Sequence, residues 1–465
     1  MRYKILAKQF INDIQQKRVQ PGQRLPSLRS FAAQQEVSLT TAVNCYRYLE
    51  ELGWVRSRPK SGFFASEPLV SSTRNQSAIT KSSNDLTKFS KRRLLTNSGP
   101  LGISLPAIDL LPTEALQRSM YRSIRDQGNK VHFYPDPLGE PHLRQALSRH
   151  FSNSGFNFSE HELVISNGCL DAVRIAVEVT TKPGDTVAVC SPCFTTLIHL
   201  LVKLHRKVLE IPMTEKGIDL EQLEQHMYMR TINAGLFNCS NINPTGISLC
   251  KTQKQKLANL ATQYQIPIIE DDIYIEISHQ PTLPLPVYNW DQEGYILWCS
   301  SVSKTLAAGY RVGWCLPGRY LECYQDRLLH ESLGVSTSTQ LALADFISSG
   351  QYARHLNNLK SQLNHQVNEY RHYLIKKLPN NVKISAPQGG LVLWVQVPGL
   401  NCESMVSKLQ AMKVDIRLGQ DFSTQGLYQE FFRINCGWPL KNKDGNISLA
   451  GQQLEKIIKL IHELI

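Results

Sequence analysis

The stretch "CSSVSKTLAAGYRVGW", Cys299 to Trp314, decides how the fold is interpreted. It sets one lysine, Lys304, among serines directly after the strand-like run "YILWCS", and Arg311 follows seven residues later between two glycines. A lysine in a polar loop after a strand is ordinary by itself. Its meaning depends on which polar residues follow the other strands of the same sheet.

Strand-like and helix-like segments alternate from about residue 160, which predicts a doubly wound α/β domain. We expect strands within 162–166, 185–191, 234–240, 266–274 and 295–300, and helices within 167–180 and 251–265. In such sheets ligands bind beyond the carboxyl ends of the strands. The residues that follow these strands are therefore the candidates for a site.

The polar and aromatic residues after these strands form a chemically coherent set. They are Gly168, Cys169, Phe194, Asn243, Asp271, Tyr274, Lys304 and Arg311. The set contains an amine for a Schiff base, an acid, an amide and a phenol for a phenolate oxygen, an aromatic plate, and an arginine with serines for an anion. Pyridoxal phosphate needs these functions together, so we expect this cofactor.

Asn243 in "NPTG", Asp271 and Tyr274 in "EDDIY", and Lys304 in "SVSK" before "GYRVGW" resemble the fold-type I aminotransferases. The resemblance implies that Lys304 holds the cofactor as an internal aldimine and that Asp271 pairs with the pyridine nitrogen. It implies that Asn243 and Tyr274 bind the phenolate oxygen and that Phe194 stacks on the ring. The implied phosphate site consists of Ser301, Ser303, Arg311 and the backbone amides of Cys169 and Leu170.

Two further matches lie outside these strand ends. "FYPDPLGEPHLRQAL" resembles the segment whose tyrosine, here Tyr134, reaches the phosphate of the partner subunit. Arg433 in "FFRINCGW" stands where the family binds the substrate α-carboxylate, although a strand-end arginine in a surface ion pair is the alternative. The chain also departs from the family, because "CLDA" follows Gly168 and Phe194 replaces a commoner tyrosine.

The charge is concentrated at the N-terminal end. Residues 1–100 hold 17 Lys and Arg against 6 Asp and Glu, a net charge of +11, while the whole chain carries +12. Residues 101–465 are therefore nearly neutral. An excess confined to one end is typical of a segment that meets a polyanion.

The basic end has the pattern of a winged helix-turn-helix. Residues 3–18 predict one helix, Ser27 caps a second, and Ser38 caps a third that ends before Gly53, with two extended segments around residues 59–62. A three-helix bundle without a partner is the alternative. The motifs "PGQRLPSLRSFA" and "VSLTTAVNCYRYLEELGWVRSRPKSGFF" resemble the DNA-binding domain of the GntR family of bacterial regulators.

This resemblance implies specific contacts with double-stranded DNA. Arg29 and Arg47 would contact phosphates or bases, and Lys60 to Gly62 would follow the minor groove. The outward start of the third helix, with Ser38, Thr40 and Thr41, would enter the major groove. Many relatives have arginine where this chain has Leu39, so their base preference does not transfer.

The domain division follows from these patterns. We expect a winged helix-turn-helix at 1–66, a flexible basic linker at 67–100 and an aminotransferase-like body at 101–465. The large part of the body spans about 130–340. The small α+β part spans about 341–465, with helices expected within 351–378 and 452–465 and a strand within 389–397.

A GntR-type head joined to such a body resembles the MocR subfamily of transcription regulators. The resemblance implies a homodimer that binds an operator and senses an amino acid or amine through pyridoxal phosphate. The alternatives are a working aminotransferase that carries a DNA-binding head, and a constitutive repressor with the body as a scaffold. Effector, operator and the direction of regulation stay open.

The remaining composition agrees with an intracellular protein. No apolar run is long enough to cross a bilayer, and "MRYKILAKQF" lacks the apolar block of a signal peptide, so we expect the cytoplasm and no membrane. The 11 cysteines are an odd number without regular spacing, which argues against a disulfide framework. Cys190 and Cys193 form one C-x-x-C pair without a second, so we expect no metal site.

Overall fold

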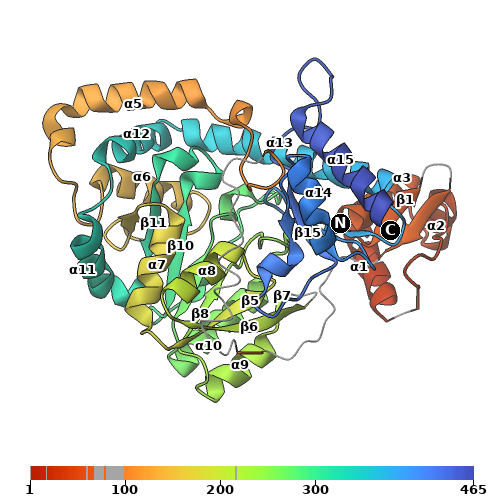
Figure 1. Ribbon diagram of the computed structural model, residues 1–465, viewed down its shortest axis with the longest axis horizontal. Coiled ribbons are helices and arrows are strands. Elements are labelled where there is room, and N and C mark those ends of the chain that lie inside the picture. The colour runs from red at the N-terminus through yellow and green to blue at the C-terminus, as the bar shows by residue number, and fades with distance from the viewer. Residues whose placement is uncertain (1, 17, 59–60, 67–77, 80–98, 215–216) are drawn as a thin grey trace.

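The structure, a computed structural model, describes residues 2–16, 18–58, 61–66, 78–79, 99–214 and 217–465. A small N-terminal head lies against one end of a much larger body (Figure 1). Both chain termini lie where the head meets the body. The body itself consists of a large domain around one sheet and a small domain around another.

The head is built as its sequence predicts. Its helices are α1 (Arg2–Gln15), α2 (Leu28–Gln34) and α3 (Leu39–Glu51), and its hairpin is β1 (Val55–Arg58) with β2 (Gly62–Ala65). The side chains of Ser27 and Ser38 accept hydrogen bonds from the backbone amides of Ser30 and Thr41, which caps α2 and α3. Cys45, Tyr46 and other inward residues of α3 are fully buried in the core of the head.

The large domain has a mixed sheet that is parallel through its centre. Within the described residues the strand order is β3-β6-β5-β8-β9-β10-β11-β4, and β7 pairs with β6. The strands from β6 to β10 are parallel, whereas β3, β11 and β4 are antiparallel to their neighbours. Their bounds are β3 Ala78–Ile79, β4 Val164–Ser166, β5 Thr186–Ser191, β6 Lys207–Thr214, β7 Gly217–Ile218, β8 Ala234–Phe237, β9 Ile268–Asp271, β10 Ile296–Ser301 and β11 Gly313–Leu316.

Helices cover this sheet. The helices are α5 (Thr113–Gln127), α6 (Pro141–Ser152), α7 (Cys169–Thr180), α8 (Thr195–Lys203), α9 (Leu220–Tyr228), α10 (Lys251–Tyr264), α11 (Leu321–Ser332) and α12 (Thr337–Ser348). Side chains of α7, α8 and α10 share a core with β5, β8 and β9, and side chains of α6 and α12 share another with β10 and β11. Strands covered in this way read as continuous apolar runs, which is why the doubly wound fold was predictable.

Several strands were absent from the sequence-based prediction. Glu210 and Pro212 interrupt the apolar run of β6, and β11 begins directly after the loop that holds Arg311. Strand β3, Ala78–Ile79, pairs with β6 and falls inside the segment expected to be a flexible linker. The other residues expected in the linker lie outside the described residues, apart from 99 and 100.

The small domain is an antiparallel sheet covered by helices. Its strands are β12 (Lys383–Ile384), β13 (Val392–Gln396), β14 (Arg417–Leu418) and β15 (Phe431–Asn435), in the order β12-β13-β15-β14. Its helices are α13 (Gln351–Lys377), α14 (Val406–Ala411) and α15 (Leu449–Leu464). Leu101 is buried in this core and its carbonyl accepts from the amide of Asn435 at 2.7 Å, so the start of the body belongs to the small domain.

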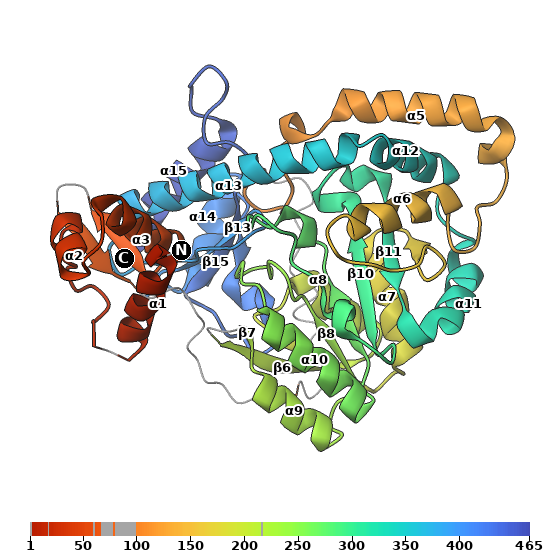
Figure 2. The same cartoon turned by 180° about the vertical axis from the view of Figure 1, so that it is seen from behind.

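Helix α13 connects distant parts of the molecule. Figure 2 shows it running from α12 to the head. Tyr352 and Leu356 near its start are buried with the core around β10 and β11, and Tyr370 and Leu374 near its end are buried in the small-domain core.

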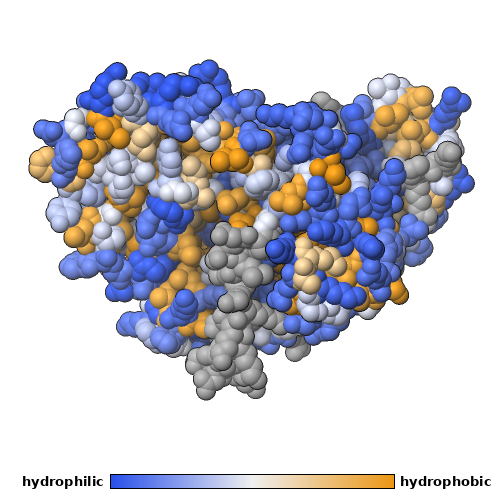
Figure 3. Space-filling view, turned by 45° about the horizontal axis from the view of Figure 1, so that its top comes forward, coloured by the Kyte–Doolittle hydropathy of each residue, from blue (hydrophilic) through white to orange (hydrophobic). Residues whose placement is uncertain are grey.

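The described residues include no helix with the length and apolar composition that a membrane span requires. On the face drawn in Figure 3, hydrophilic residues predominate and hydrophobic residues form separate patches.

Candidate functional site

Lys304 lies just beyond the carboxyl end of β10. The side chain of Ser301 accepts from the amide of Ser303 at 3.3 Å and starts a 3-10 turn, Val302–Lys304. Lys304 Nζ donates to the carbonyl oxygen of Ser104 at 2.7 Å and lies 5.6 Å from the centre of the Tyr274 ring. Because β9 and β10 are parallel neighbours, Asp271 ends its strand at the same edge of the sheet.

A second group joins the large domain to the small domain. Asn243 Nδ2 donates to the hydroxyl of Tyr274 at 3.3 Å, and Arg433 Nη1 donates to Asn243 Oδ1 at 3.3 Å. Arg433 Nη2 also donates to the carbonyl oxygen of Gly102. The tertiary structure thus brings Arg433 of β15 beside Asn243 and Tyr274.

Arg433 is deeply buried and incompletely bonded. It is 2% exposed, and its Nε has no hydrogen-bond partner among the described residues. Burial lowers its pKa to about 10, against the opposing effect of Tyr274. The alternative of a surface ion pair is therefore wrong, because the guanidinium is inside the protein.

Asp271 is also buried. Its Oδ1 accepts from the thiol of Cys169 at 3.1 Å. Burial raises its pKa, while the bond from Cys169 and the charge of Lys304 oppose that rise. A carboxylate desolvated in this way is stabilised by a nearby cation such as a protonated ring nitrogen.

The N-terminus of α7 lies beside Arg311 and the serines that follow β10, the groups expected to bind the phosphate; we call this arrangement the phosphate cradle. Gly168 has φ +85°, which strains any residue with a side chain, and a Cβ built on it would lie 2.3 Å from Arg311 Nη2. Arg311 donates to the carbonyl oxygens of Asn167 at 3.0 Å and Ala308 at 3.2 Å. Gly313 pairs with Ser301 in the sheet, and a Cβ on Gly313 would lie 2.4 Å from the backbone of Gly168. The serines after β10, Arg311 and the N-terminus of α7 therefore lie next to one another.

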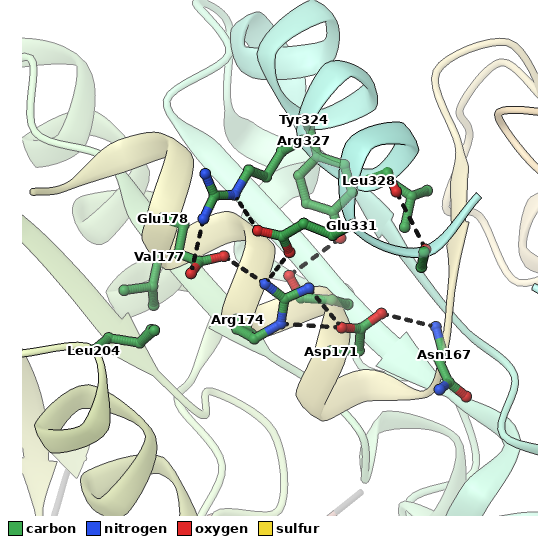
Figure 4. Close-up of polar contacts among 12 residues, drawn as sticks. Asn167, Asp171, Arg174, Val177, Glu178, Leu204, Tyr324, Arg327, Leu328 and Glu331 are labelled. Carbon is green, nitrogen blue, oxygen red and sulfur yellow. Dashed lines mark hydrogen bonds and ion pairs between the residues drawn. The ribbon is translucent and has the colours of Figure 1, made fainter. Parts of the chain in front are cut away.

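An ion network holds α7 against α11 (Figure 4). Asp171 accepts from the amide of Asn167 at 3.1 Å and from Arg174 Nη2 at 2.9 Å. Arg174 also donates to Glu178 at 2.6 Å and to Glu331. Buttressing by α11 fixes the helix whose N-terminus forms the cradle.

Phe194, Leu170 and Tyr134 complete the set of residues expected at the cofactor. Phe194 stands at the start of α8 and packs against an aromatic cluster with Trp394 and Phe422. Leu170 is exposed in the first turn of α7. Tyr134 is 83% exposed, so within this chain it faces solvent.

These residues fit pyridoxal phosphate. Lys304 offers an amine and Asp271 a buried acid, while Gly168 and Arg311 offer an anion cradle. Beside them Arg433 Nε and the hydroxyl of Ser104 are buried without partners among the described residues, as expected of atoms that await a ligand.

Sequence reasoning missed several contributors. Gly102 and Ser104 lie in a segment without strand or helix periodicity, which left no signal for them. Asn241 Nδ2 donates to the carbonyl oxygen of Tyr274 at 2.9 Å, and its place two residues before Asn243 in "NINPTG" was a usable signal. For Cys169 the sequence predicted a role of the backbone amide but not of the thiol, which bonds Asp271.

The head presents most of its predicted DNA contacts on the surface. Arg29, Ser38, Thr40, Arg47 and Gly62 are exposed, Thr41 is half-buried, and Lys60 lies outside the described residues. The hydroxyl of Ser38 is engaged in capping α3.

Beside the β1–β2 hairpin, the wing of the head, stands Arg24, a residue not among the predicted DNA contacts. A Cβ on Gly62, which has φ +96°, would lie 3.7 Å from Arg24 Nε. Arg24 therefore stands beside the glycine of the wing.

Comparisons with known proteins match both parts of the chain. Residues 2–65 match the family described as bacterial regulatory proteins, gntR family, and residues 104–444 match aminotransferase class I and II. The HTH-type transcriptional regulator YdcR of Escherichia coli K12 is 32% identical over 98% of this chain and 99% of its own length. The HTH-type transcriptional regulator YjiR of the same organism is 31% identical over 94% of this chain and 95% of its own length.

Solved structures match the body. LysN, an α-aminoadipate aminotransferase from Thermus thermophilus complexed with N-(5'-phosphopyridoxyl)-L-leucine, has a TM-score of 0.72 at 20% identity, covering 83% of this chain and 97% of that one. This likeness shows the fold alone. Together with the central sheet, it confirms the predicted fold-type I body.

Proposed function

Because this chain belongs to the GntR family of bacterial regulatory proteins and carries an aminotransferase class I and II body, in the MocR architecture, we propose that it senses an amino acid or amine through pyridoxal phosphate. One observation carries the proposal. A head with an exposed set of candidate DNA-contacting residues is joined to a body whose Lys304, Asp271 and Arg433 converge on one buried site.

The proposed site assigns a task to each residue. When bound, pyridoxal phosphate supplies an electrophilic aldehyde for which the amines of Lys304 and of an effector compete. Asp271 would hold the ring nitrogen, and Asn243 with Tyr274 would donate to the ring oxygen. The backbone at Cys169 and Leu170, with Ser301, Ser303 and Arg311, would hold the phosphate.

Arg433 would bind the carboxylate of an amino acid effector. Its Nε has no partner among the described residues, and its other nitrogens donate to an amide oxygen and a carbonyl oxygen. A carboxylate would satisfy the free donor and compensate the buried charge. This supports an effector that carries both an amine and a carboxylate.

Helix α13 offers a path from this site to the head. The hydroxyls of Thr305, next to Lys304, and Tyr352 lie 2.9 Å apart, and His355 Nε2 lies 2.6 Å from the carbonyl oxygen of Thr305. Farther along the same helix, Arg371 donates to the carbonyl oxygen of Glu50 in the head at 3.0 Å. A change at Lys304 that moves α13 would therefore reach the head, provided that the effector binds one arrangement better.

We further propose a cytoplasmic homodimer that binds a double-stranded operator with two heads. Exposed aromatic residues on the body, including Phe133 and Tyr134, support an interface there. In that arrangement Tyr134 would complete the cofactor site of the other subunit.

The test is a titration of the purified protein loaded with pyridoxal phosphate. A panel of amino acids and amines is added while the visible absorbance of the cofactor and the affinity for operator DNA are followed together. We expect at least one compound to change both with the same midpoint.

The same titration separates the alternatives. Keto acid released in many turnovers would identify a working aminotransferase. A protein that takes up no cofactor would identify the body as a scaffold and would contradict the proposal.

A further inference from the structure

The junction between head and body is held by two arginines that donate to backbone carbonyls across it. Arg371, near the end of α13, donates to the carbonyl oxygen of Glu50 in the head at 3.0 Å. Arg56, on β1 of the head, donates to the carbonyl oxygens of Asn380 at 3.4 Å and Val382 at 3.2 Å in the small domain. The pair thus ties the two domains together, with one arginine from each domain.

A cavity of about 470 Å³ lies between these elements. Among the described residues that line it, the cations are Arg56, Arg371 and Lys376, and the only carboxylate is that of Glu50. The apolar part of the wall comes from Val55, Leu374, Ile375, Leu378, Val382 and Ile384. Charge at one place and aliphatic carbon around it are the features of a site for a small amphipathic anion.

Arg371 carries a buried charge in the wall of this cavity. It is only 4% exposed, and its Nε has no hydrogen-bond partner among the described residues. The carboxylate of Glu50 accepts instead from the amide of Ser57 at 3.0 Å and from its hydroxyl at 2.6 Å. Burial and the nearby charge of Arg56 lower the pKa of Arg371 to about 10, and the charge of Glu50 only partly opposes them. A buried guanidinium without a bonded carboxylate is costly, and an anion in the cavity would offset that cost.

We propose that this junction cavity binds a small organic anion, with its phosphate or carboxylate group against Arg371 and Arg56 and its carbon skeleton against the aliphatic wall. The site is separate from the one at Lys304. Arg371 lies 16 residues beyond His355 on α13, a distance of about 24 Å along the helix.

Such a ligand would act on the position of the head. The walls of the cavity come from both domains, so the complete site exists only while the head is seated on the small domain. A ligand that binds one arrangement better shifts the population toward it. The anion therefore stabilises the seated head, independently of any amino acid at Lys304.

Calorimetric titration of the full chain, loaded with pyridoxal phosphate so that the phosphate cradle is filled, tests this site. The probes are inorganic phosphate, phenyl phosphate and butyrate, at constant ionic strength. We expect saturable binding of at least one probe, weakened about tenfold or more by Arg371→Gln and by Arg56→Gln, because each removes a charge-assisted hydrogen bond. The preferred probe distinguishes a phosphate from a carboxylate ligand.

Arg354→Gln is the matched control, because it removes an exposed cation from the same helix outside the cavity lining. It should leave the midpoint unchanged. Absence of saturable binding to the unmodified protein would overturn the proposal, and so would an unchanged midpoint in the Arg371 and Arg56 variants. If Arg371→Gln does not fold, Arg56→Gln and Lys376→Gln decide by the same criterion.

Discussion

At the scale of single residues, Lys304 owes its position to β10 and to the capping turn that Ser301 starts. Its Nζ donates to the carbonyl oxygen of Ser104 and lies 5.6 Å from the centre of the Tyr274 ring, contacts whose loss should leave the fold intact. We expect Lys304→Ala to lose the absorption band of lysine-bound cofactor and to keep normal operator affinity without effector. Effector should no longer change that affinity.

The measurement compares absorbance and operator binding for the unmodified protein, Lys304→Ala and the exposed control Lys443→Ala, each with and without effector. If Lys304→Ala still responded to effector as the control does, the switch would lie elsewhere.

Arg433 yields a second prediction at this scale. We expect Arg433→Ala to weaken amino acid binding, followed by the spectral response, by about 2–4 kcal/mol. The reason is that a buried carboxylate loses its charged partner. Cofactor binding should change far less, since the residue lies beside Asn243 rather than in the phosphate cradle. Simple amines without a carboxylate should bind both proteins alike. An unchanged midpoint for amino acids would place the carboxylate elsewhere.

At the scale of elements, α3 depends on its N-cap. The hydroxyl of Ser38 accepts from the amide of Thr41 at 3.2 Å, and the hydroxyl of Ser27 accepts from the amide of Ser30 at 3.2 Å in the same way. Ser38→Ala and Ser27→Ala should each destabilise the head by about 1 kcal/mol. We expect Ser38→Ala to weaken operator binding more, because only Ser38 starts the helix expected to enter the major groove.

Thermal unfolding and operator titration of both variants measure the two effects. Equal losses of operator affinity would show that Ser38 acts through the stability of the head and not through a contact with DNA.

At the scale of the whole molecule, the body exposes aromatic side chains to water, which is unfavourable unless another surface covers them. Tyr121, Phe133 and Tyr134 are more than 70% exposed. We expect a homodimer in sedimentation experiments at micromolar concentration, with cofactor bound. Tyr134→Ala should weaken cofactor retention if that residue crosses to the other subunit. A cofactor-loaded monomer at that concentration would contradict the proposal.

The sequence by itself determined the central parallel strands, the helices of the head and several of the residues at their ends. Apolar runs covered on both faces revealed the strands β5, β8, β9 and β10, and Ser27 and Ser38 marked two helix starts, because these signals are local. Lys304, Asp271 and Asn243 could be assembled because the ends of parallel strands meet at one edge.

Only the tertiary structure decided the contacts between residues far apart in the chain. Arg433 bonds Asn243 and Gly102 across 190 and 331 residues, and Lys304 bonds Ser104 across 200. The seat of the head on α13 likewise joins Arg371 to Glu50 across 321 residues. No local periodicity encodes such pairs, because they arise from how the domains pack on one another and not from the conformation of either segment.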